Sequence, residues 1–388
     1  MSVKYLKNKS LCPLPFAGLY IAPDGDARCC SISQEKLGNV NNTSIEKIIN
    51  SDKVKKIRRD MLDEKFPANC SECYKKEKNF KSLNLEDISN RLYHIGKLGS
   101  RPFKLYKDEN NFDLQQLDIR WRNSCNAACV YCDPAFSNRW AAELNIKKKM
   151  TPNALEDSAK YVYKNLHNLT TLYLCGGEPF LVKENLKLCQ IIAETNPKLD
   201  IRINTNLSNL KNPIFEIIKK LPNIHWIISA ESMKEKFEYI RWPLKWETFE
   251  DNLKIIQKLP HKISVNMSWN LLTAEHIFEF VDYMMSLNLH PNAFVMNTVT
   301  SPDYFDICNL PKKYIDSIKS EAQERLGRLK DPFMLKYCYK AMIEHCNNKS
   351  VNKQEKLKRE LNILDKRRNI DSRKVFPKLY KEVFNEYM

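Results

Sequence analysis

Three cysteines crowd into one short segment of the chain, and their spacing suits iron chemistry. Cys125, Cys129 and Cys132 follow the pattern Cys-x3-Cys-x2-Cys. Three thiolates can hold three irons of a [4Fe–4S] cube and leave the fourth iron open to an external ligand. Zinc is the main alternative, because tetrahedral thiolate sites also use closely spaced cysteines. A structural zinc site normally needs a fourth protein ligand, however, and no Cys or His follows closely after Cys132.

Further motifs follow these cysteines at the ends of predicted strands. Tyr131 stands just before the last cysteine, and Cys175-Gly176-Gly177-Glu178-Pro179 comes after the second predicted strand. Ser229 ends the fourth predicted strand, and Arg241 follows twelve residues later. In this order and at these strand ends, the motifs resemble the radical S-adenosylmethionine (SAM) superfamily. A plain turn at the Gly-Gly-Glu-Pro segment and a surface position for Arg241 are the structural alternatives.

The resemblance implies which residues bind the cofactors. Cys125, Cys129 and Cys132 would hold the SAM-binding [4Fe–4S] cluster and so carry the catalytic role. The exposed backbone of the glycine pair beside the Glu178 carboxylate suits the methionyl ammonium group. Ser229 and Arg241 suit the methionyl carboxylate through a charge-assisted hydrogen bond. The residues expected around SAM are Tyr131, Gly176, Gly177, Glu178, Pro179, Asn204, Asn206, Ser229 and Arg241. Asn204 and Asn206 are candidates for the ribose, or alternatively cap the next helix.

The implied chemistry is radical chemistry carried by these cofactors. One electron from the cluster cleaves SAM into methionine and a 5′-deoxyadenosyl radical, which abstracts a hydrogen atom from the substrate. A flavodoxin- or ferredoxin-type protein is the expected reductant.

Four cysteines near the N-terminus suggest a second metal centre. Cys12, Cys30, Cys70 and Cys73 supply four thiolates over about sixty residues, enough to ligate a second cluster fully. The pattern resembles the auxiliary-cluster modules called SPASM and twitch, except that it precedes the core domain. Cys29 is the alternative to Cys30, although the Gly-x4-Cys spacing from Gly25 favours Cys30. A four-cysteine zinc site that only staples the domain is the competing interpretation.

Between residues 113 and 300, short apolar runs alternate with longer amphipathic ones, which predicts parallel strands joined by crossover helices. The expected strands are Leu114–Arg120, Thr171–Leu174, Asp200–Asn204, Ile224–Ser229, Ile263–Trp269 and Ala293–Val299. The expected helices include Pro152–Leu166, Lys183–Asn196, Pro213–Leu221, Trp246–Leu259 and Ala274–Leu287. Six such units build a small barrel or an open doubly wound sheet. The resemblance implies an α/β fold with a partial (β/α)6 barrel of the TIM type.

The regions before and after this core differ from it. A Pro23-Asp24-Gly25 turn predicts a hairpin, and a helix is expected near Ile45–Asp63. Residues 309–388 read as basic helices. The expected domains are therefore an auxiliary iron–sulfur domain over 1–100, a radical SAM core over 101–300 and a basic helical extension over 301–388.

Composition sets the broad class of the protein. The 388 residues are 43% hydrophobic, enough to bury a sizeable core, and carry a net charge of +16. No apolar run is long enough to span a membrane, and no signal-peptide cleavage site follows the first apolar stretch. Thirteen cysteines without an export signal favour metal or redox chemistry over disulfides, so a cytoplasmic location is expected. The lone cysteines elsewhere are expected to be small buried hydrophobic residues.

The substrate is open at this stage. A peptide or protein side chain is the first choice, because related auxiliary-cluster enzymes often modify peptides. RNA or a nucleotide is the second, since basic residues between Lys356 and Lys374 lie near Phe376 and Tyr380, which are placed for base stacking. The helical spacing of Leu357, Leu361 and Leu364 instead favours a solvated basic face on a packed helix. A non-catalytic electron carrier or a zinc-stapled scaffold is a further alternative.

Overall fold

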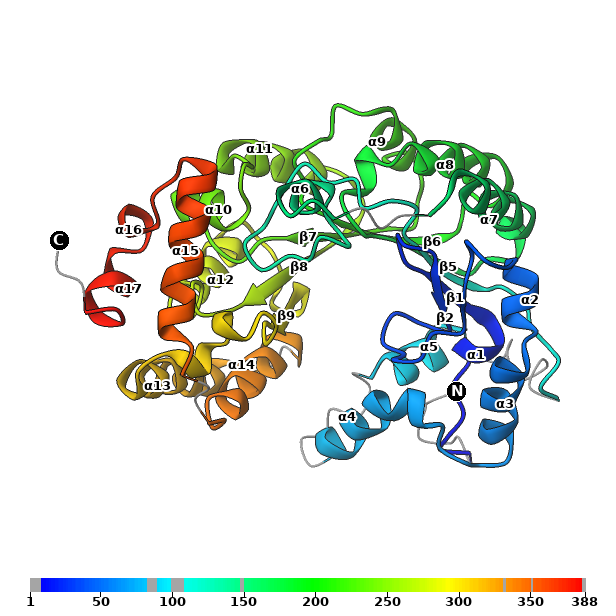
Figure 1. Ribbon diagram of the computed structural model, residues 1–388, viewed down its shortest axis with the longest axis horizontal. Coiled ribbons are helices and arrows are strands. Elements are labelled where there is room, and N and C mark those ends of the chain that lie inside the picture. Colours follow the sequence, from blue (N-terminus) through cyan, green and yellow to red (C-terminus); the bar gives the residue numbers. More distant parts are fainter. Residues whose placement is uncertain are drawn as a thin grey trace. The chain divides into compact units, whose positions relative to one another are not determined.

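The computed structural model describes residues 8–81, 89–98, 108–146, 150–330, 333–349 and 352–385. The chain forms two compact units (Figure 1). The first consists of Met1–Cys125, Pro134–Asn204 and Lys211–His225, and the second of Asn126–Asp133, Thr205–Leu210 and Trp226–Met388. The boundaries of these units differ from those of the three expected domains, which stay a prediction.

The first unit is built on a mixed sheet whose strand order is β3-β2-β1-β4-β5-β6. Its strands are β1 (Gly18–Ile21), β2 (Asp26–Arg28), β3 (Gly38–Asn39), β4 (Gln116–Ile119), β5 (Thr171–Leu174) and β6 (Asp200–Thr205). β1 to β3 pair antiparallel, which confirms the hairpin expected at the Pro-Asp-Gly turn. The hairpin then joins the predicted core, because β1 pairs parallel with β4. The parallel pairing continues through β5 to β6.

Helices complete the first unit. α7 begins after Thr151, whose side chain accepts a hydrogen bond from the backbone N–H of Ala154, and Pro152 occupies its first turn, where no N–H is needed. The helices are α1 (Leu14–Ala17), α2 (Ile45–Ile49), α3 (Asp52–Leu62), α4 (Ser71–Lys81), α5 (Asn90–Leu98), α6 (Asn138–Glu143), α7 (Pro152–Asn165), α8 (Lys183–Thr195) and α9 (Pro213–Ile218).

The helix expected near Ile45–Asp63 is two helices, α2 and α3. Asn50 ends α2, and its side chain donates a hydrogen bond to the carbonyl of Glu46. Ser51 then has extended backbone angles and precedes α3. Asn and Ser offer the backbone local hydrogen bonds that compete with a continuous helix, which explains the break.

The second unit contains β7 (Ile224–Ser229), β8 (Lys262–Trp269) and β9 (Phe294–Thr298), and β8 pairs parallel with β9. Its helices are α10 (Lys234–Ile240), α11 (Trp246–Gln257), α12 (Ile277–Ser286), α13 (Lys312–Arg328), α14 (Phe333–His345), α15 (Gln354–Arg368), α16 (Ser372–Val375) and α17 (Pro377–Glu382). The six strands expected between residues 113 and 300, and the helices between them, are thus confirmed to within three residues at each end; α9 ends three residues earlier than expected, and α12 begins three residues later. The helical C-terminal region is confirmed as well.

The C-terminal helices are packed rather than laid open for base stacking. Leu357, Leu361 and Leu364 form the buried side of α15. Phe376 and Tyr380, expected as stacking residues, are buried, with 4% and 1% of their surface exposed. They pack inward because the short helices α16 and α17 bring their apolar side chains into the core. The stacking role is therefore wrong, and the solvated-face interpretation of the basic residues is favoured.

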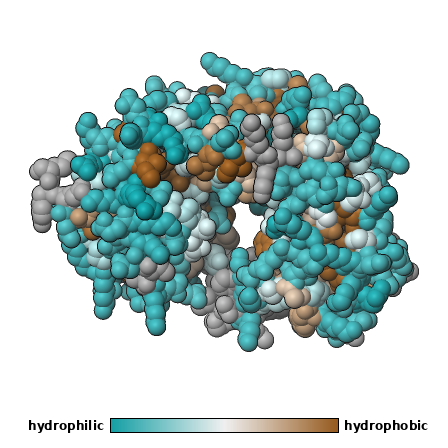
Figure 2. Space-filling model, in the orientation of Figure 1, coloured by the Kyte–Doolittle hydropathy of each residue, from teal (hydrophilic) through white to brown (hydrophobic). Residues whose placement is uncertain are grey.

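On the face of the molecule drawn in Figure 2, hydrophilic residues predominate and hydrophobic ones form small patches. Within the described ranges, no helix combines the length and the apolar composition that a membrane crossing requires.

Candidate functional site

The sheet of the first unit has one apolar and one polar face. Side chains alternate along a strand, so residues two apart share a face. Leu117, Leu172 and Ile201 lie on the buried apolar face. The opposite face carries polar residues from the same strands, namely Gln116, Asp118, Thr171, Tyr173 and Arg202.

The Gly176–Gly177 pair follows β5 and packs against the segment that leads into the first cysteine. Both glycines have positive φ angles, +84° and +67°, which side chains rarely adopt. A Cβ on Gly177 would overlap the backbone carbonyl of Ser124, so only glycine permits this approach. The next backbone N–H, that of Glu178, donates a 2.8 Å hydrogen bond to the same Ser124 carbonyl. The glycine motif and the residue before Cys125 are thereby held together.

The Glu178 side chain has a structural task as well. It is fully buried and caps the 3-10 helix Pro179–Leu181, accepting from the backbone N–H of Phe180 at 3.4 Å. Pro179 starts that helix, where its missing N–H costs nothing. The expected contact of Glu178 with the methionyl amine stays a prediction.

Hydrogen bonds to α6 hold Cys125 in the first unit. Its backbone N–H donates to the side-chain oxygen of Asn138 at 2.7 Å. The backbone N–H of Asn138 in turn donates to the carbonyl of Asn123 at 2.7 Å. Cys125 itself is half-buried.

The other two cysteines lie in the second unit, on a loop anchored to the end of α10. The backbone N–H groups of Ala128 and Val130 donate to the carbonyls of Trp242 and Ile240, at 2.7 and 2.9 Å. Cys129 is buried between these anchors, and burial raises the pKa of its thiol. Cys132 is half-buried.

A buried ion pair lies beside Cys129. Arg241 donates through Nε to Glu231 Oε1 at 3.0 Å, and its Nη1 lies 4.0 Å from the sulfur of Cys129. Tyr131 donates its hydroxyl to the same Glu231 oxygen at 3.0 Å. Burial by itself would lower the pKa of Arg241, but Glu231 beside it raises that pKa above its usual value. The guanidinium therefore stays charged next to the Cys129 sulfur.

Sequence reasoning missed Glu231. The residue is completely buried and joins Tyr131 to Arg241. Its position, two residues after the strand that ends in Ser229, was visible in the sequence. That position indicated no role, because the partners Tyr131 and Arg241 are known only from the structure. Because Arg241 is engaged with Glu231, its expected contact with the methionyl carboxylate stays a prediction.

The remaining expected SAM residues lie at strand ends. Asn206 donates through its side chain to the side-chain oxygen of Asn126, at 2.9 Å, and Asn126 donates to Ser208 at 2.8 Å. Asn204 and Ser229 are half-buried on β6 and β7. Asn206 thus supports the cysteine loop of the second unit, and a contact with ribose stays a prediction for both asparagines.

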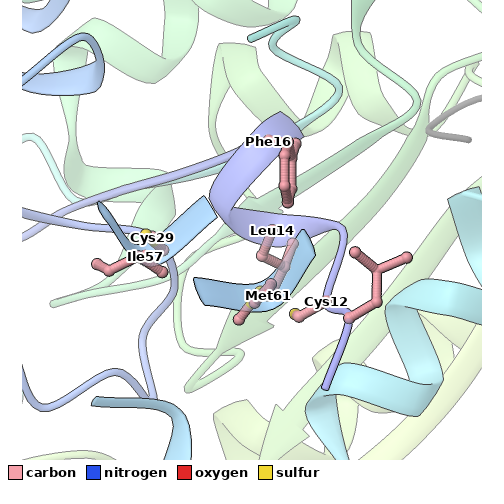
Figure 3. Close-up of a cluster of buried hydrophobic side chains, with 7 residues drawn as sticks. Cys12, Leu14, Phe16, Cys29, Ile57 and Met61 are labelled. Atoms are coloured by element: carbon pink, nitrogen blue, oxygen red, sulfur yellow. The ribbon is translucent and has the colours of Figure 1, made fainter. Parts of the chain in front are cut away.

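The four N-terminal cysteines come together. Cys12, Cys30, Cys70 and Cys73 line one cavity of the first unit. Cys29 is absent from this lining and lies in a neighbouring hydrophobic cluster with Leu14, Phe16, Ile57 and Met61, to which Cys12 also belongs (Figure 3). The placement favours Cys30 over Cys29 as the fourth thiol.

The donor set of this cavity fits a metal centre. Burial raises the pKa of Cys30 to about 11 and that of Cys70 to about 12, and the neighbouring thiols Cys30 and Cys73 raise the pKa of Cys70 further. Burial and the neighbouring thiols also raise the pKa of Cys12. Four clustered thiols with raised pKa values do not ionise together unless a cation takes up their charge.

A cationic side chain supports the same cavity. Arg91 lines it and donates to the carbonyl of Leu11 at 2.8 Å, which fixes the residue before Cys12. Its Nε donates to Glu77 at 2.9 Å. Burial raises the pKa of Cys73, and a hydrogen bond from the Arg91 backbone together with the Arg91 positive charge opposes that increase. Nothing in the spacing of the cysteines indicated this arginine, because it lies 18 residues beyond Cys73.

Family models match both parts of the site. Residues 119–284 match the model described as the radical SAM superfamily. Residues 12–74 match the model described as an iron–sulfur cluster-binding domain, SPASM. The second match covers Cys12, Cys30, Cys70 and Cys73, and the first covers the three cysteines of the loop.

Curated relatives match part of the chain. The GTP 3′,8-cyclase of Clostridium botulinum (strain Hall) is 24% identical over 219 residues, which cover 55% of this chain and 57% of that protein. The GTP 3′,8-cyclase of Campylobacter lari is 27% identical over 124 residues, 31% of this chain and 36% of that protein. The chain therefore spans little more than half the length of the first of these relatives.

Two solved structures are similar over comparable lengths. One is anSMEcpe with bound AdoMet and Cp18Cys peptide, at 17% identity and a TM-score of 0.40, covering 53% of this chain and 57% of that chain. The other is Streptococcus suis SuiB bound to S-adenosylmethionine, at 18% identity and a TM-score of 0.41, covering 66% and 60%.

Proposed function

This chain carries a radical SAM domain over residues 119–284 and an iron–sulfur cluster-binding domain over residues 12–74, and from that premise we propose that the protein is an enzyme that abstracts a hydrogen atom from an amino-acid side chain of a peptide or protein. The contact of Gly177 and Glu178 with Ser124 carries the proposal, because it joins the glycine motif to the residue before Cys125. An electron carrier or a zinc-stapled scaffold has no need of that contact.

When bound, the [4Fe–4S] cluster and SAM supply one-electron cleavage and a 5′-deoxyadenosyl radical. Cys125, Cys129 and Cys132 would hold the cluster. The backbone of Gly176 and Gly177 would receive the methionyl end of SAM. Cys12, Cys30, Cys70 and Cys73 would hold the auxiliary cluster, which would supply a second one-electron centre or a binding point for the substrate.

The second unit contributes charge and shielding around Cys129. The buried Arg241 guanidinium lies beside the sulfur and offsets thiolate charge, while Glu231 keeps that guanidinium in place. Tyr131 closes the network through its hydroxyl group. A buried, hydrogen-bonded pair of this kind loses its arrangement when one partner is removed, because the other charge is then left alone.

The choice of a peptide substrate rests on the cavity of the polar sheet face. Its volume is about 170 Å³, below the roughly 300 Å³ at which pockets for whole small molecules begin. A cavity of this size admits one side chain and leaves the rest of a larger substrate outside.

A nucleotide is the second candidate substrate. The similarity to proteins named GTP 3′,8-cyclase favours it, over 55% of this chain. Incubation with SAM and GTP, beside incubation with SAM and a peptide library, separates the two candidates by which mixture yields a new product mass.

The assay for the proposed activity is formation of 5′-deoxyadenosine from SAM by anaerobic protein under dithionite. We expect Cys125→Ala to abolish it, because two thiolates do not hold the cluster in the required state. Cys189→Ala is the matched control, since Cys189 is a buried lone cysteine of α8, and it is expected to retain the wild-type rate. Undiminished 5′-deoxyadenosine formation by Cys125→Ala would contradict the proposal.

A further inference from the structure

The cavity on the polar face of the first unit's sheet contains polar atoms that lack partners. His94, Thr171, Tyr173 and Arg202 are among its lining residues. Nδ1 of His94, Oγ1 of Thr171 and Nε of Arg202 are buried and have no hydrogen-bond partner within the ranges that the structure describes. His94 and Thr171 are only 7% and 4% exposed. Buried polar atoms without partners are uncommon and costly, so these atoms indicate a place for a ligand.

Most charges around the cavity are already paired. Asp118 lines the cavity and pairs with Arg120. Nε of Arg120 lies 3.1 Å from Oδ1 of Asp118, and Nη2 of Arg120 lies 3.2 Å from Oδ2 of Asp118. Lys97 of α5 pairs with Asp200 at the start of β6. Arg202, two residues further along β6, has no acidic partner in the described part of the chain.

Aromatic rings hold the Arg202 guanidinium in position. The Cζ atom of Arg202 lies 5.0 Å from the ring centre of Tyr93 and 5.8 Å from the ring centre of Tyr173. Arginine that stacks on rings keeps its charge and its hydrogen-bond donors for a further partner. Burial, with Arg202 and Lys97 nearby, lowers the pKa of His94 to about 3, so this imidazole is neutral at pH 7. The cavity therefore offers one unpaired positive charge.

The same cavity borders the four-cysteine cavity. Cys30 and Asn90 line both. The carbonyl of Cys29 lies against Gly18, which pairs with Gln116 at the first residue of β4. Cys29 and the adjacent Cys30 therefore lie near the N-terminal ends of the parallel strands, whereas the Gly176–Gly177 turn follows the C-terminal end of β5. With β4 spanning four residues, the two ends of the strands are separated by about 13 Å.

We propose that Arg202, with His94 and Thr171, binds a carboxylate group of the substrate and holds it beside Cys30. This rests on the proposed function and names the chemical class of the substrate: an amino-acid side chain or chain terminus that carries one carboxylate. The guanidinium and the threonine hydroxyl are donors, and the neutral imidazole donates when its Nδ1 carries the proton. A carboxylate offers only acceptors and so complements all three.

The charge balance distinguishes this ligand from a nucleotide. A carboxylate carries one negative charge, which matches the single unpaired cation. A nucleoside triphosphate carries several negative charges and needs several cations or a metal ion to offset them. Within the described residues of the cavity lining, Arg202 is the cation that stands without an acidic partner.

The experiment is a calorimetric titration of the anaerobic full chain with both clusters loaded. The ligand is N-acetyl-aspartate N-methylamide, whose carboxylate is its only charge, and the uncharged analogue is N-acetyl-asparagine N-methylamide. We expect the aspartate compound to bind and the asparagine compound to bind much more weakly. Arg202→Gln is expected to weaken binding of the aspartate compound about 10- to 100-fold.

Two further variants serve as a control and as a second test of the site. Arg59→Gln is the control, because Arg59 is an exposed arginine of α3 that pairs with Glu109, and it is expected to bind like the wild type. Thr171→Val keeps the shape of the side chain and removes only the hydroxyl. It is expected to weaken binding several-fold, and it tests the site if Arg202→Gln fails to fold.

The position of the site is tested by electron paramagnetic resonance of Cys125→Ala, in which the auxiliary cluster is the remaining iron centre. The aspartate compound is expected to change that spectrum, since its carboxylate would lie beside Cys30. Equal affinity of Arg202→Gln and wild type, no binding by the wild type, or tight binding of GTP that depends on Arg202 would each overturn the proposal. Formation of 5′-deoxyadenosine is measured separately, so a failure of the SAM chemistry is distinguishable from a failure of the carboxylate site.

Discussion

Gly177 has no Cβ atom, and this allows the glycine motif to pack against the Ser124 carbonyl, directly before Cys125. Its φ of +67° and its contact with the Ser124 carbonyl both exclude a side chain. The neighbouring Gly176 likewise has a positive φ and lies against the Arg120 side chain. Two adjacent positions of this kind are hard to explain as an ordinary turn, because a turn alone does not need the close approach to another strand's loop.

We expect Gly177→Ala to displace the Ser124 carbonyl and to weaken SAM binding at least about tenfold, because a shift near one ångström at a binding site costs much of its contact energy. Equilibrium dialysis with labelled SAM measures this. Gly327→Ala is the control, since a Cβ on Gly327 in α13 meets nothing within 4 Å and alanine there favours the helix. Normal SAM binding by Gly177→Ala contradicts the role given to the glycine pair.

For single residues, the sequence indicated which residue types belong to the site but not which hydrogen-bond and ion-pair partners they have. The cysteines and the glycine motif were predictable because their spacing along the chain is short. Glu231 and Arg91 were not, since their importance comes from partners far away in sequence, such as Tyr131 for Glu231 and Leu11 for Arg91. The unpaired atoms of His94, Thr171 and Arg202 could be found only in the folded chain.

The pairing of β1 with β4 is the main finding at the scale of elements. Two adjoining regions of sequence, expected as separate domains, share one sheet in the first unit. Arg58 strengthens the connection: it is buried in α3 and donates to the carbonyls of Pro15 and Glu109, at 2.7 and 3.0 Å. The hairpin therefore covers an edge of the sheet that would otherwise expose unpaired backbone groups.

A chain reduced to residues 108–388 is expected to be insoluble or to bind little iron, because β4 becomes an uncovered edge strand. Co-expression of residues 1–107 as a separate chain supplies β1 and is expected to restore soluble protein. Solubility and iron content measure both cases. Soluble 108–388 with about four irons would show instead that the auxiliary region is detachable.

Strand and helix positions were largely predictable, and the reason is periodicity. Each strand from β4 to β9 has apolar residues at alternate or successive positions, and its alternation with amphipathic helices leaves few arrangements. The parallel contact of β1 with β4 was not predictable from either strand, because four residues carry no information about a partner almost one hundred positions away. The break between α2 and α3 has a visible cause in Asn50 and Ser51, but one Asn-Ser pair is weak evidence before the fold is known.

At the scale of the whole molecule, the two sets of cysteines predict two metal centres. One set lines a single cavity of the first unit, and the other set begins at Cys125, directly after the Ser124 that contacts the glycine motif. The superfamily and the auxiliary module were identifiable from sequence because both rest on cysteine spacing. The substrate was not, since the proposed carboxylate site depends on the charge that remains after Asp118, Lys97 and their partners have paired.

We expect about eight irons and eight sulfides per chain after anaerobic reconstitution, which corresponds to two [4Fe–4S] clusters. Cys70→Ala is expected to reduce this to about four while the cluster of the loop remains, because Cys70 belongs to the other cavity. Cys338→Ala, at a buried cysteine of α14, is the control and should keep the full iron content. Loss of all iron in Cys70→Ala would indicate general unfolding, and zinc in place of iron would refute the second cluster.

The position of the hairpin in the chain also bears on how the protein is made. Cys12, Cys30, Cys70 and Cys73 are synthesised before β4, the strand on which β1 is laid. During translation four thiols therefore emerge on a segment whose sheet partner does not yet exist. The residues that line their cavity extend to Arg91, and the strand that supports the hairpin is complete only at residue 119, so we expect these thiols to be open to stray metals and oxidants over that interval. The order of translation thus places metal delivery to this centre late, although its ligands come first.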